Sequence, residues 1–336
     1  MDIGTFFGNI FKWISDLFKP NPVNPLPQPQ PEPTGQLPPP VHIKVLLVVY
    51  NPAVPSQNNR KLSEVLGWND PDALVQSFIA DLQYASYGYA NYDIVERVEA
   101  NHFPIKSDGF AYTPDDYVHC WQSQSGFHSP DAVNYQLILN DFNIVSKVND
   151  SSIDEVWLMG FPYAGFRESR MGGPGAFFCN GEVLTNVPTN RRFVIMGFSY
   201  QRGVGEMFES MSHRAESIVQ QVFRNANGQA NYWGRFTLYD KISPGNAEVG
   251  TVHYAPNSQT DYEWGNPTYV PSRCKNWLLF PDLSAAPSSV NCSEWGNGDI
   301  RLHHIWWLRH FPHITGEANM ISYNWWKYVT DPNNVR

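Results

Sequence analysis

The stretch HIKVLLVVY, residues 42–50, decides the fold class of this chain. A continuous apolar run of this length is typical of a strand that is buried on both faces of a sheet. Helical and strand-like patterns alternate after it. They are helical at 71–85, strand-like at 91–103, helical at 131–148, strand-like at 153–161 and 191–200, and helical at 204–223. This order predicts an α/β fold, a mostly parallel twisted sheet with helices on both faces.

The composition fits a folded chain with a large aromatic content. Of its 336 residues, only 16% are charged and 15% are aromatic, including 12 tryptophans. Surplus tryptophan and tyrosine occur on surfaces that stack against sugars or partners, and also in large aromatic cores, so the sequence leaves both explanations open. The net charge is 23 − 32 = −9 and there is no basic run, which argues against a nucleic-acid partner.

Residues 1–19 have the pattern of an amphipathic helix. Apolar side chains recur every three or four residues, and the polar ones fall elsewhere. The apolar runs are too short to span a bilayer, and the acidic start without a continuous apolar region argues against a secretory signal. We therefore predict an anchoring helix that lies on a membrane surface or docks on a protein assembly. The alternative is a terminal helix packed on its own domain.

A proline-rich segment, residues 20–41, follows this helix. It holds ten of the 27 prolines of the chain, and proline favours the extended polyproline II conformation, so the segment is predicted to be a stiff spacer. A short helix on such a spacer resembles in outline the targeting peptides of bacterial microcompartment cargo, and equally the anchors of peripheral membrane proteins. The resemblance implies attachment to a membrane or to an assembly.

The remaining residues, 42–336, are predicted to form a single globular domain with two parts. Residues 42–236 carry the α/β pattern. Residues 237–336 consist of short segments rich in tyrosine, tryptophan and proline, which predict irregular β structure and long loops packed on the sheet edge. Cys274 and Cys292 flank a loop in this part that a disulfide could close.

The predicted helix 204–223 carries a stripe of ionisable side chains opposite its apolar face. At about 100° per residue, Glu206, Glu209, His213 and Glu216 fall within roughly 80° of each other. Such a stripe can bind a divalent metal or carry out acid–base chemistry, or it can be a solvated face whose charges, Arg214 included, pair along the helix. Burial decides between these interpretations, because buried carboxylates need a cation, protons or arginines as compensation.

The predicted topology gives this stripe neighbours. Parallel sheets place their sites outside the carboxyl ends of the strands, and the helix directly follows the last predicted strand. Ionisable residues follow the other strands at the same edge. The predicted catalytic residues are therefore His102, Glu168, Arg202, Glu206 and Glu209.

His213 and Glu216 form an H-x-x-E pair, which makes zinc the first candidate metal. This four-residue pattern resembles the pair used by zinc carboxypeptidases, where a third histidine comes from far downstream. Here His253, His303 or His304 could be the further ligand, with His253 and His303 as the first choices. One position would stay open for water, with Glu209 as the general base.

Missing motifs narrow the function classes. The sequence contains no G-x-S-x-G, G-x-G-x-x-G, P-loop or H-E-x-x-H pattern, which argues against a nucleotide ligand and against the common hydrolase and zinc-protease signatures. Two hypotheses remain. The first is a hydrolase, metal-assisted or run by carboxylates, that acts on a glycan or peptide-like polymer; the second is a non-catalytic binding or structural module tethered through its N-terminal helix. The predicted contacts to the polymer are Tyr163, Trp264, Trp306 and Trp307.

Overall fold

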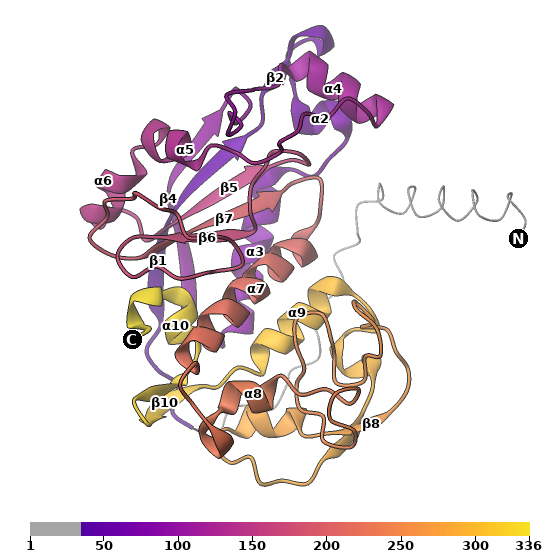
Figure 1. Cartoon of the computed structure of the whole chain (residues 1–336). Coiled ribbons are helices and arrows are strands. Elements are labelled where there is room, and N and C mark those ends of the chain that lie inside the picture. The colour runs from indigo at the N-terminus through magenta and orange to yellow at the C-terminus, as the bar shows by residue number, and fades with distance from the viewer. Residues whose placement is uncertain (1–34) are drawn as a thin grey trace, which may run out of the picture.

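A five-stranded sheet forms the centre of the computed structural model, which describes residues 35–336 (Figure 1). The strand order is β4-β1-β5-β7-β6. The first four are parallel to their neighbours, and β6 runs antiparallel to β7 at one edge. The strands are β1 (Val41–Tyr50), β4 (Ala90–Ala100), β5 (Glu155–Gly160), β6 (Ser169–Gly172) and β7 (Phe193–Ser199). The predicted α/β class with a mostly parallel sheet is confirmed.

Strand β1 lies in the interior of the sheet, as its apolar run predicts. Its last six residues are all buried, because β4 and β5 flank the strand and helices cover both faces. On one face, α3 (Pro71–Ala85) and α7 (Val204–Val222) pack together. Phe78 of α3 lies 5.3 Å from Trp157 of β5 and 5.1 Å from Phe208 of α7, measured between ring centroids.

The opposite face is covered by two short helices where the sequence predicted a single helix at 131–148. These are α5 (Tyr135–Asp141) and α6 (Ile144–Asn149). Asn143 separates them because its φ of 53° is left-handed and interrupts the helical path. Phe142, beside the break, packs edge-on against Tyr50 of β1. Smaller elements gather near the top of Figure 1, beyond β1: β2 (Ala53–Val54), β3 (Arg60–Lys61), α2 (Leu62–Leu66) and α4 (Pro114–Ser123).

The C-terminal part has the predicted small antiparallel sheets and loops, and it also contains helices. Helix α9 (Ile300–Arg309) lies against α7 and α3 (Figure 1). The predicted short β segments are present as two antiparallel pairs. The remaining elements are α8 (Tyr232–Phe236), β8 (Val270–Ser272), β9 (Ser288–Val290), β10 (His313–Ala318), β11 (Ile321–Asn324) and α10 (Trp326–Thr330).

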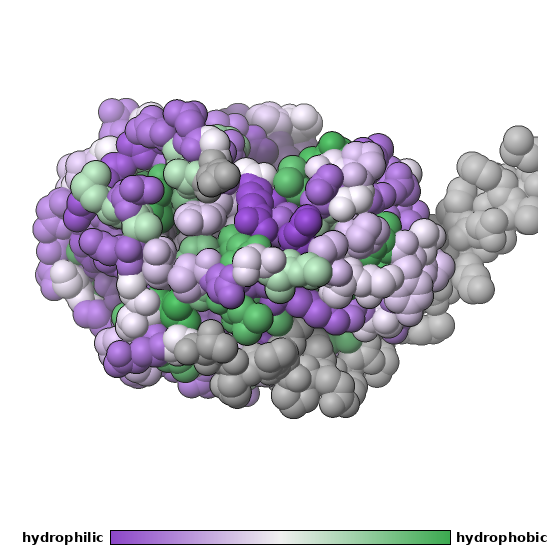
Figure 2. All heavy atoms as spheres, turned by 90° about the horizontal axis from the view of Figure 1, so that it is seen from below, coloured by the Kyte–Doolittle hydropathy of each residue, from purple (hydrophilic) through white to green (hydrophobic). Residues whose placement is uncertain are grey.

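Much of the aromatic content fills the interior of this C-terminal part. The Phe236 ring lies 5.0–5.6 Å from the rings of Trp277, Trp307 and Trp325. Trp306 and Trp307, predicted to bind substrate, are only 1% and 0% exposed, so neither offers a face to a ligand. On the molecular face seen from below, apolar side chains form separate small patches among hydrophilic ones (Figure 2).

The predicted anchoring helix at 1–19 and most of the spacer lie outside the described residues. The described end of the spacer runs beside β10, where the Thr315 backbone N–H donates to the Gln36 carbonyl at 2.8 Å. Within residues 35–336, no helix has the length and apolarity needed to cross a membrane. All four cysteines are free thiols, so Cys274 and Cys292 are not bridged.

Candidate functional site

Helix α7 begins where β7 reaches the carboxyl edge of the sheet. The Glu206 carboxylate accepts a hydrogen bond from the Gly203 backbone N–H (3.0 Å), so this predicted catalytic residue also caps its own helix.

The apolar face of α7 packs inward as predicted, and Met207 and Phe208 are fully buried. The opposite stripe is not a solvated face, because Glu209 is only 8% exposed. Residues 252–262 of the C-terminal part contact it, which favours a compensated site.

Three side chains meet in this covered region as a candidate metal centre. Atoms of Glu209, His213 and His253 that can bind a metal all lie within 4.8 Å of one another. The Nε2 atoms of His213 and His253 are 3.0 Å apart, and His253 Nε2 lies 3.7 Å from Glu209 Oε1. Glu209 and His213 are four residues apart on α7 and therefore share a face. His253 comes from the C-terminal part.

A carboxylate fixes the far side of each imidazole ring. His213 Nδ1 lies 3.0 Å from Glu216 Oε2, and His253 Nδ1 lies 3.1 Å from Asp261 Oδ1. The other oxygen of Glu216 accepts the Val252 backbone N–H at 3.0 Å, which joins the loop to the helix. Metal-binding histidines are held in this way in proteins, with the second ring nitrogen donating to a carboxylate.

This arrangement leaves two nitrogen lone pairs facing each other. If each Nδ1 carries the proton that its carboxylate accepts, both Nε2 atoms are unprotonated in the neutral rings. Two lone pairs 3.0 Å apart repel each other unless a proton or a metal cation lies between them. The donor set therefore fits a cation, and two imidazoles with one carboxylate are ligands that zinc accepts.

The electrostatics of the group favour charged side chains. Burial alone would raise the pKa of Glu209, but the neighbouring His253, His304 and His213 rings lower that pKa overall. Burial would lower the pKa of His213, but Glu216, Glu168 and Glu209 raise it overall. Without a metal, protonation of His213 is thus favoured, and a metal must displace that proton in order to bind.

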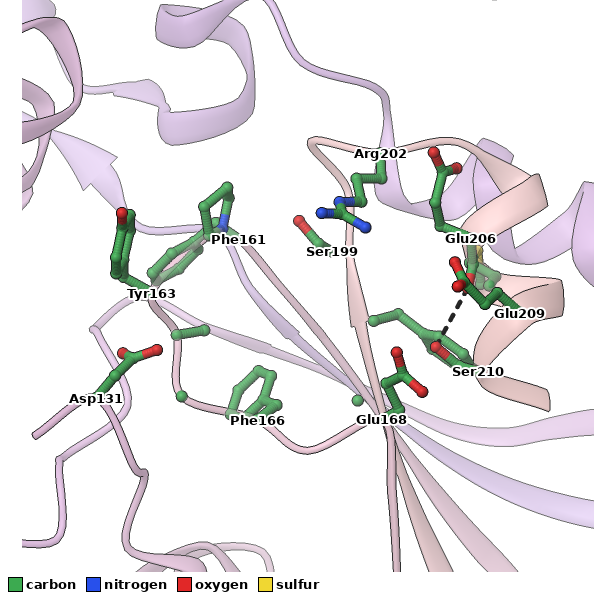
Figure 3. A pocket seen from close by; sticks show the side chains of 16 residues that line it. Asp131, Phe161, Tyr163, Phe166, Glu168, Ser199, Arg202, Glu206, Glu209 and Ser210 are labelled. Atoms are coloured by element: carbon green, nitrogen blue, oxygen red, sulfur yellow. Dashed lines mark hydrogen bonds between the residues drawn. The ribbon is translucent and has the colours of Figure 1, made fainter. Parts of the chain in front are cut away.

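A pocket of about 220 Å³ adjoins the metal centre, and Glu209 belongs to both. Figure 3 shows Glu168, Glu206, Glu209 and Arg202 along one side and the aromatic rings of Phe161, Tyr163 and Phe166 along the other. Sites that bury a whole drug-sized ligand have roughly 300–1,000 Å³. The pocket is therefore suited to one residue or one ring of a longer molecule.

Glu168 is one of two pocket carboxylates, with Glu206, whose pKa is raised by burial. It lies just before β6, and burial raises its pKa, with the neighbouring Glu209 carboxylate adding to the rise. The side-chain amide of Asn180 donates to Glu168 Oε2. A carboxyl group with a raised pKa beside a pocket is a candidate general base or acid.

The structure brings most of the predicted site residues together and separates others. Glu168, Arg202, Glu206, Glu209 and Tyr163 line the pocket, and Tyr163 is 41% exposed. His102, in contrast, is exposed and packs edge-on against Tyr50, outside the pocket lining.

The ligand set differs from the predicted one. Glu216, predicted as a ligand, instead contacts His213 Nδ1, on the side of the ring away from the candidate metal position. Glu209, predicted as the general base, is the carboxylate grouped with the two imidazoles. His303 is fully buried, stacks on Trp264 and lies outside the group. Burial lowers its pKa well below the usual value. Trp264 is itself only 6% exposed, so it acts as a packing residue here.

Two further residues of the site, Asp261 and Tyr262, were not predicted. Both lie on the loop that follows His253, and no spacing rule connects them with α7. The Tyr262 ring packs against the His253 ring, with centroids 4.2 Å apart, and its hydroxyl lies near the Glu209 carboxylate.

Replacing Asp261 with asparagine is expected to weaken zinc binding about 10- to 100-fold, because the His253 ring loses the carboxylate that orients it. Competition with a chromophoric chelator at neutral pH measures this change. Asp282→Asn, in an exposed loop, is the matched control and should leave the affinity unchanged. Equal affinities for both variants would show that Asp261 does not support the site.

No family model matches the chain, and no curated protein and no solved structure matches it significantly.

Proposed function

We propose that the chain is a metal-assisted hydrolase, with Glu209, His213 and His253 as ligands of a zinc-type ion. The observation that carries the proposal is the 3.0 Å approach of two Nε2 atoms whose rings are each held by a carboxylate. Catalytic zinc sites commonly have three protein ligands and one position for water. The adjoining pocket, which Glu209 also lines, would admit the substrate.

The pocket supplies the other groups that hydrolysis requires. A bound metal lowers the pKa of its water and polarises a substrate carbonyl. Glu168, which lines the same pocket, would accept the water proton and return it to the leaving group. Arg202 adds positive charge on the same side of the pocket (Figure 3).

The substrate proposed for this site is a glycan or peptide-like polymer with a hydrolysable carbonyl group. The pocket volume of about 220 Å³ suits one unit of such a polymer. Tyr163 stacks on Phe127 with ring centroids 3.8 Å apart and is partly exposed, so it offers a flat surface beside the pocket.

Replacing Glu168 with glutamine is expected to reduce hydrolysis about 100- to 10,000-fold, because the site loses its proton carrier. Zinc binding should persist, since Glu168 is not in the ligand group. The assay compares the zinc-loaded variants on p-nitrophenyl acetate and on peptide and acetylated oligosaccharide libraries. Glu182→Gln, an exposed carboxylate on the same connection, is the control. Zinc binding by the unmodified chain without hydrolysis of any probe would favour the non-catalytic module.

A further inference from the structure

Tyr262 covers the candidate metal centre from the side of the C-terminal part. Its ring lies against the His253 ring, with centroids 4.2 Å apart and planes 36° from parallel. Its hydroxyl lies beside the Glu209 carboxylate, and burial, together with the charge of that carboxylate, raises the pKa of the tyrosine. One side chain thus contacts two of the three candidate ligands. It is also 50% exposed, so it lies at the boundary between the centre and solvent.

The backbone holds Tyr262 in an unfavourable conformation. Its φ of 60° is left-handed, which is uncommon for a bulky residue, and such residues concentrate at functional sites. Neighbouring contacts enforce the conformation. The Tyr262 backbone N–H donates to the His253 carbonyl at 3.2 Å, and the preceding Asp261 binds the His253 ring. The Glu263 carboxylate accepts the Gln259 backbone N–H at 2.5 Å, which closes the loop.

The Tyr262 ring also packs edge-on against the buried Trp264, with centroids 5.3 Å apart, but neither this contact nor the closure of the loop uses the tyrosine hydroxyl. A half-exposed ring contributes little to a hydrophobic core, and the loop is closed by Glu263 and Ser258 without the tyrosine hydroxyl. The left-handed backbone does hold the Tyr262 hydroxyl near the three candidate ligands.

We propose that Tyr262 is a catalytic hydrogen-bond donor, whose hydroxyl turns from Glu209 to the oxygen anion that forms when metal-bound water attacks a carbonyl group. This proposal rests on the proposed function. The new C–O bond forms as the carbonyl π bond opens, the water proton goes to Glu168, and the negative charge collects on the former carbonyl oxygen between the metal and Tyr262. Tyr262 keeps its own proton throughout.

The chemistry of the hydroxyl fits this role. Burial, together with the nearby Glu209 charge, raises the pKa of Tyr262 to about 12, so the hydroxyl remains a donor at neutral pH. A metal ion bound to Glu209 withdraws charge from the carboxylate and weakens it as an acceptor. The oxygen anion is then the stronger acceptor, and a donor already in position stabilises it without reorganisation.

Cobalt and acetohydroxamate test the proposal, since cobalt reports its coordination by visible absorption and the hydroxamate supplies a charged oxygen to the metal. We expect Tyr262→Phe in the full chain to weaken hydroxamate binding about tenfold or more. Cobalt affinity itself should change by less than about threefold. Tyr254→Phe is the matched control, because this substitution also removes a tyrosine hydroxyl one residue from His253. The Tyr254 ring stacks on Tyr239.

Three results would contradict the donor role of Tyr262, and one of them would also contradict the metal centre. Unchanged hydroxamate affinity in Tyr262→Phe would overturn the donor role. A loss of cobalt affinity as large as the loss of hydroxamate affinity would assign Tyr262 to support of the ligands, and would also overturn it. Failure of the unmodified chain to bind cobalt at all would refute the metal centre, and the donor role would fall with it.

Discussion

Replacing Arg214 with methionine is expected to destabilise the fold by about 3–5 kcal/mol, because the change leaves a buried carboxylate without its partner. The Arg214 side chain is 0% exposed and binds both oxygens of Glu155 on β5, at 3.0 and 2.7 Å. It also donates to the Val329 carbonyl at 2.8 Å, so it connects the sheet, α7 and α10. Urea unfolding of the full chain measures the effect.

A double variant tests the assigned cause. Glu155→Leu with Arg214→Met removes both charges, so it should recover much of the stability that Arg214→Met loses. Trp157 would still lose its acceptor, since its ring N–H donates to Glu155 at 2.6 Å, and the recovery should therefore be incomplete. If Arg214→Met lies within 1 kcal/mol of the unmodified chain, the pair does not hold the layers together.

Replacing His213 or His253 with alanine is expected to lower zinc affinity more than about 100-fold. Loss of a residue that only orients a ligand already costs about 10- to 100-fold, and these substitutions remove the ligand itself. Each one also ends the 3.0 Å contact between the two Nε2 atoms. Isothermal titration with zinc, with chelator competition for the tight cases, measures the loss.

His128→Ala is the matched control for both histidine variants. His128 also pairs with a carboxylate, at 2.7 Å from Asp108, but it lies outside the ligand group. Its removal should leave zinc affinity unchanged. Equal losses in all three variants would point to non-specific binding by surface imidazoles.

The parallel sheet could be predicted because its strands are long and apolar. The strand at 42–50 and the helix at 204–223 each bury a continuous apolar surface. The sequence shows this burial as a continuous apolar run in the first case and as a helical period in the second. Strand β6 (Ser169–Gly172) could not be predicted, since four residues carry too little alternation. The break at Asn143 was also missed, because an apolar period does not show a single left-handed residue.

The candidate site was predicted from one helix, from the topology that places Glu168 and Arg202 near it, and from His253 as one of several possible downstream ligands. The stripe with Glu209 and His213 is local, and its place at the carboxyl edge follows from the topology. Its burial depends on packing by the C-terminal part, which contributes His253 from 40 residues away. The burial of Arg214 was missed for the same reason, because its partner Glu155 lies 59 residues earlier.

Anomalous diffraction from zinc-soaked crystals of the full chain tests the metal centre most directly. The structure predicts one strong peak bonded to His213 Nε2, His253 Nε2 and a Glu209 oxygen, at about 2.0–2.2 Å from each. Data collected on both sides of the zinc absorption edge identify the element at that peak. No peak between these three side chains, or zinc bound only by other residues, would contradict the central claim.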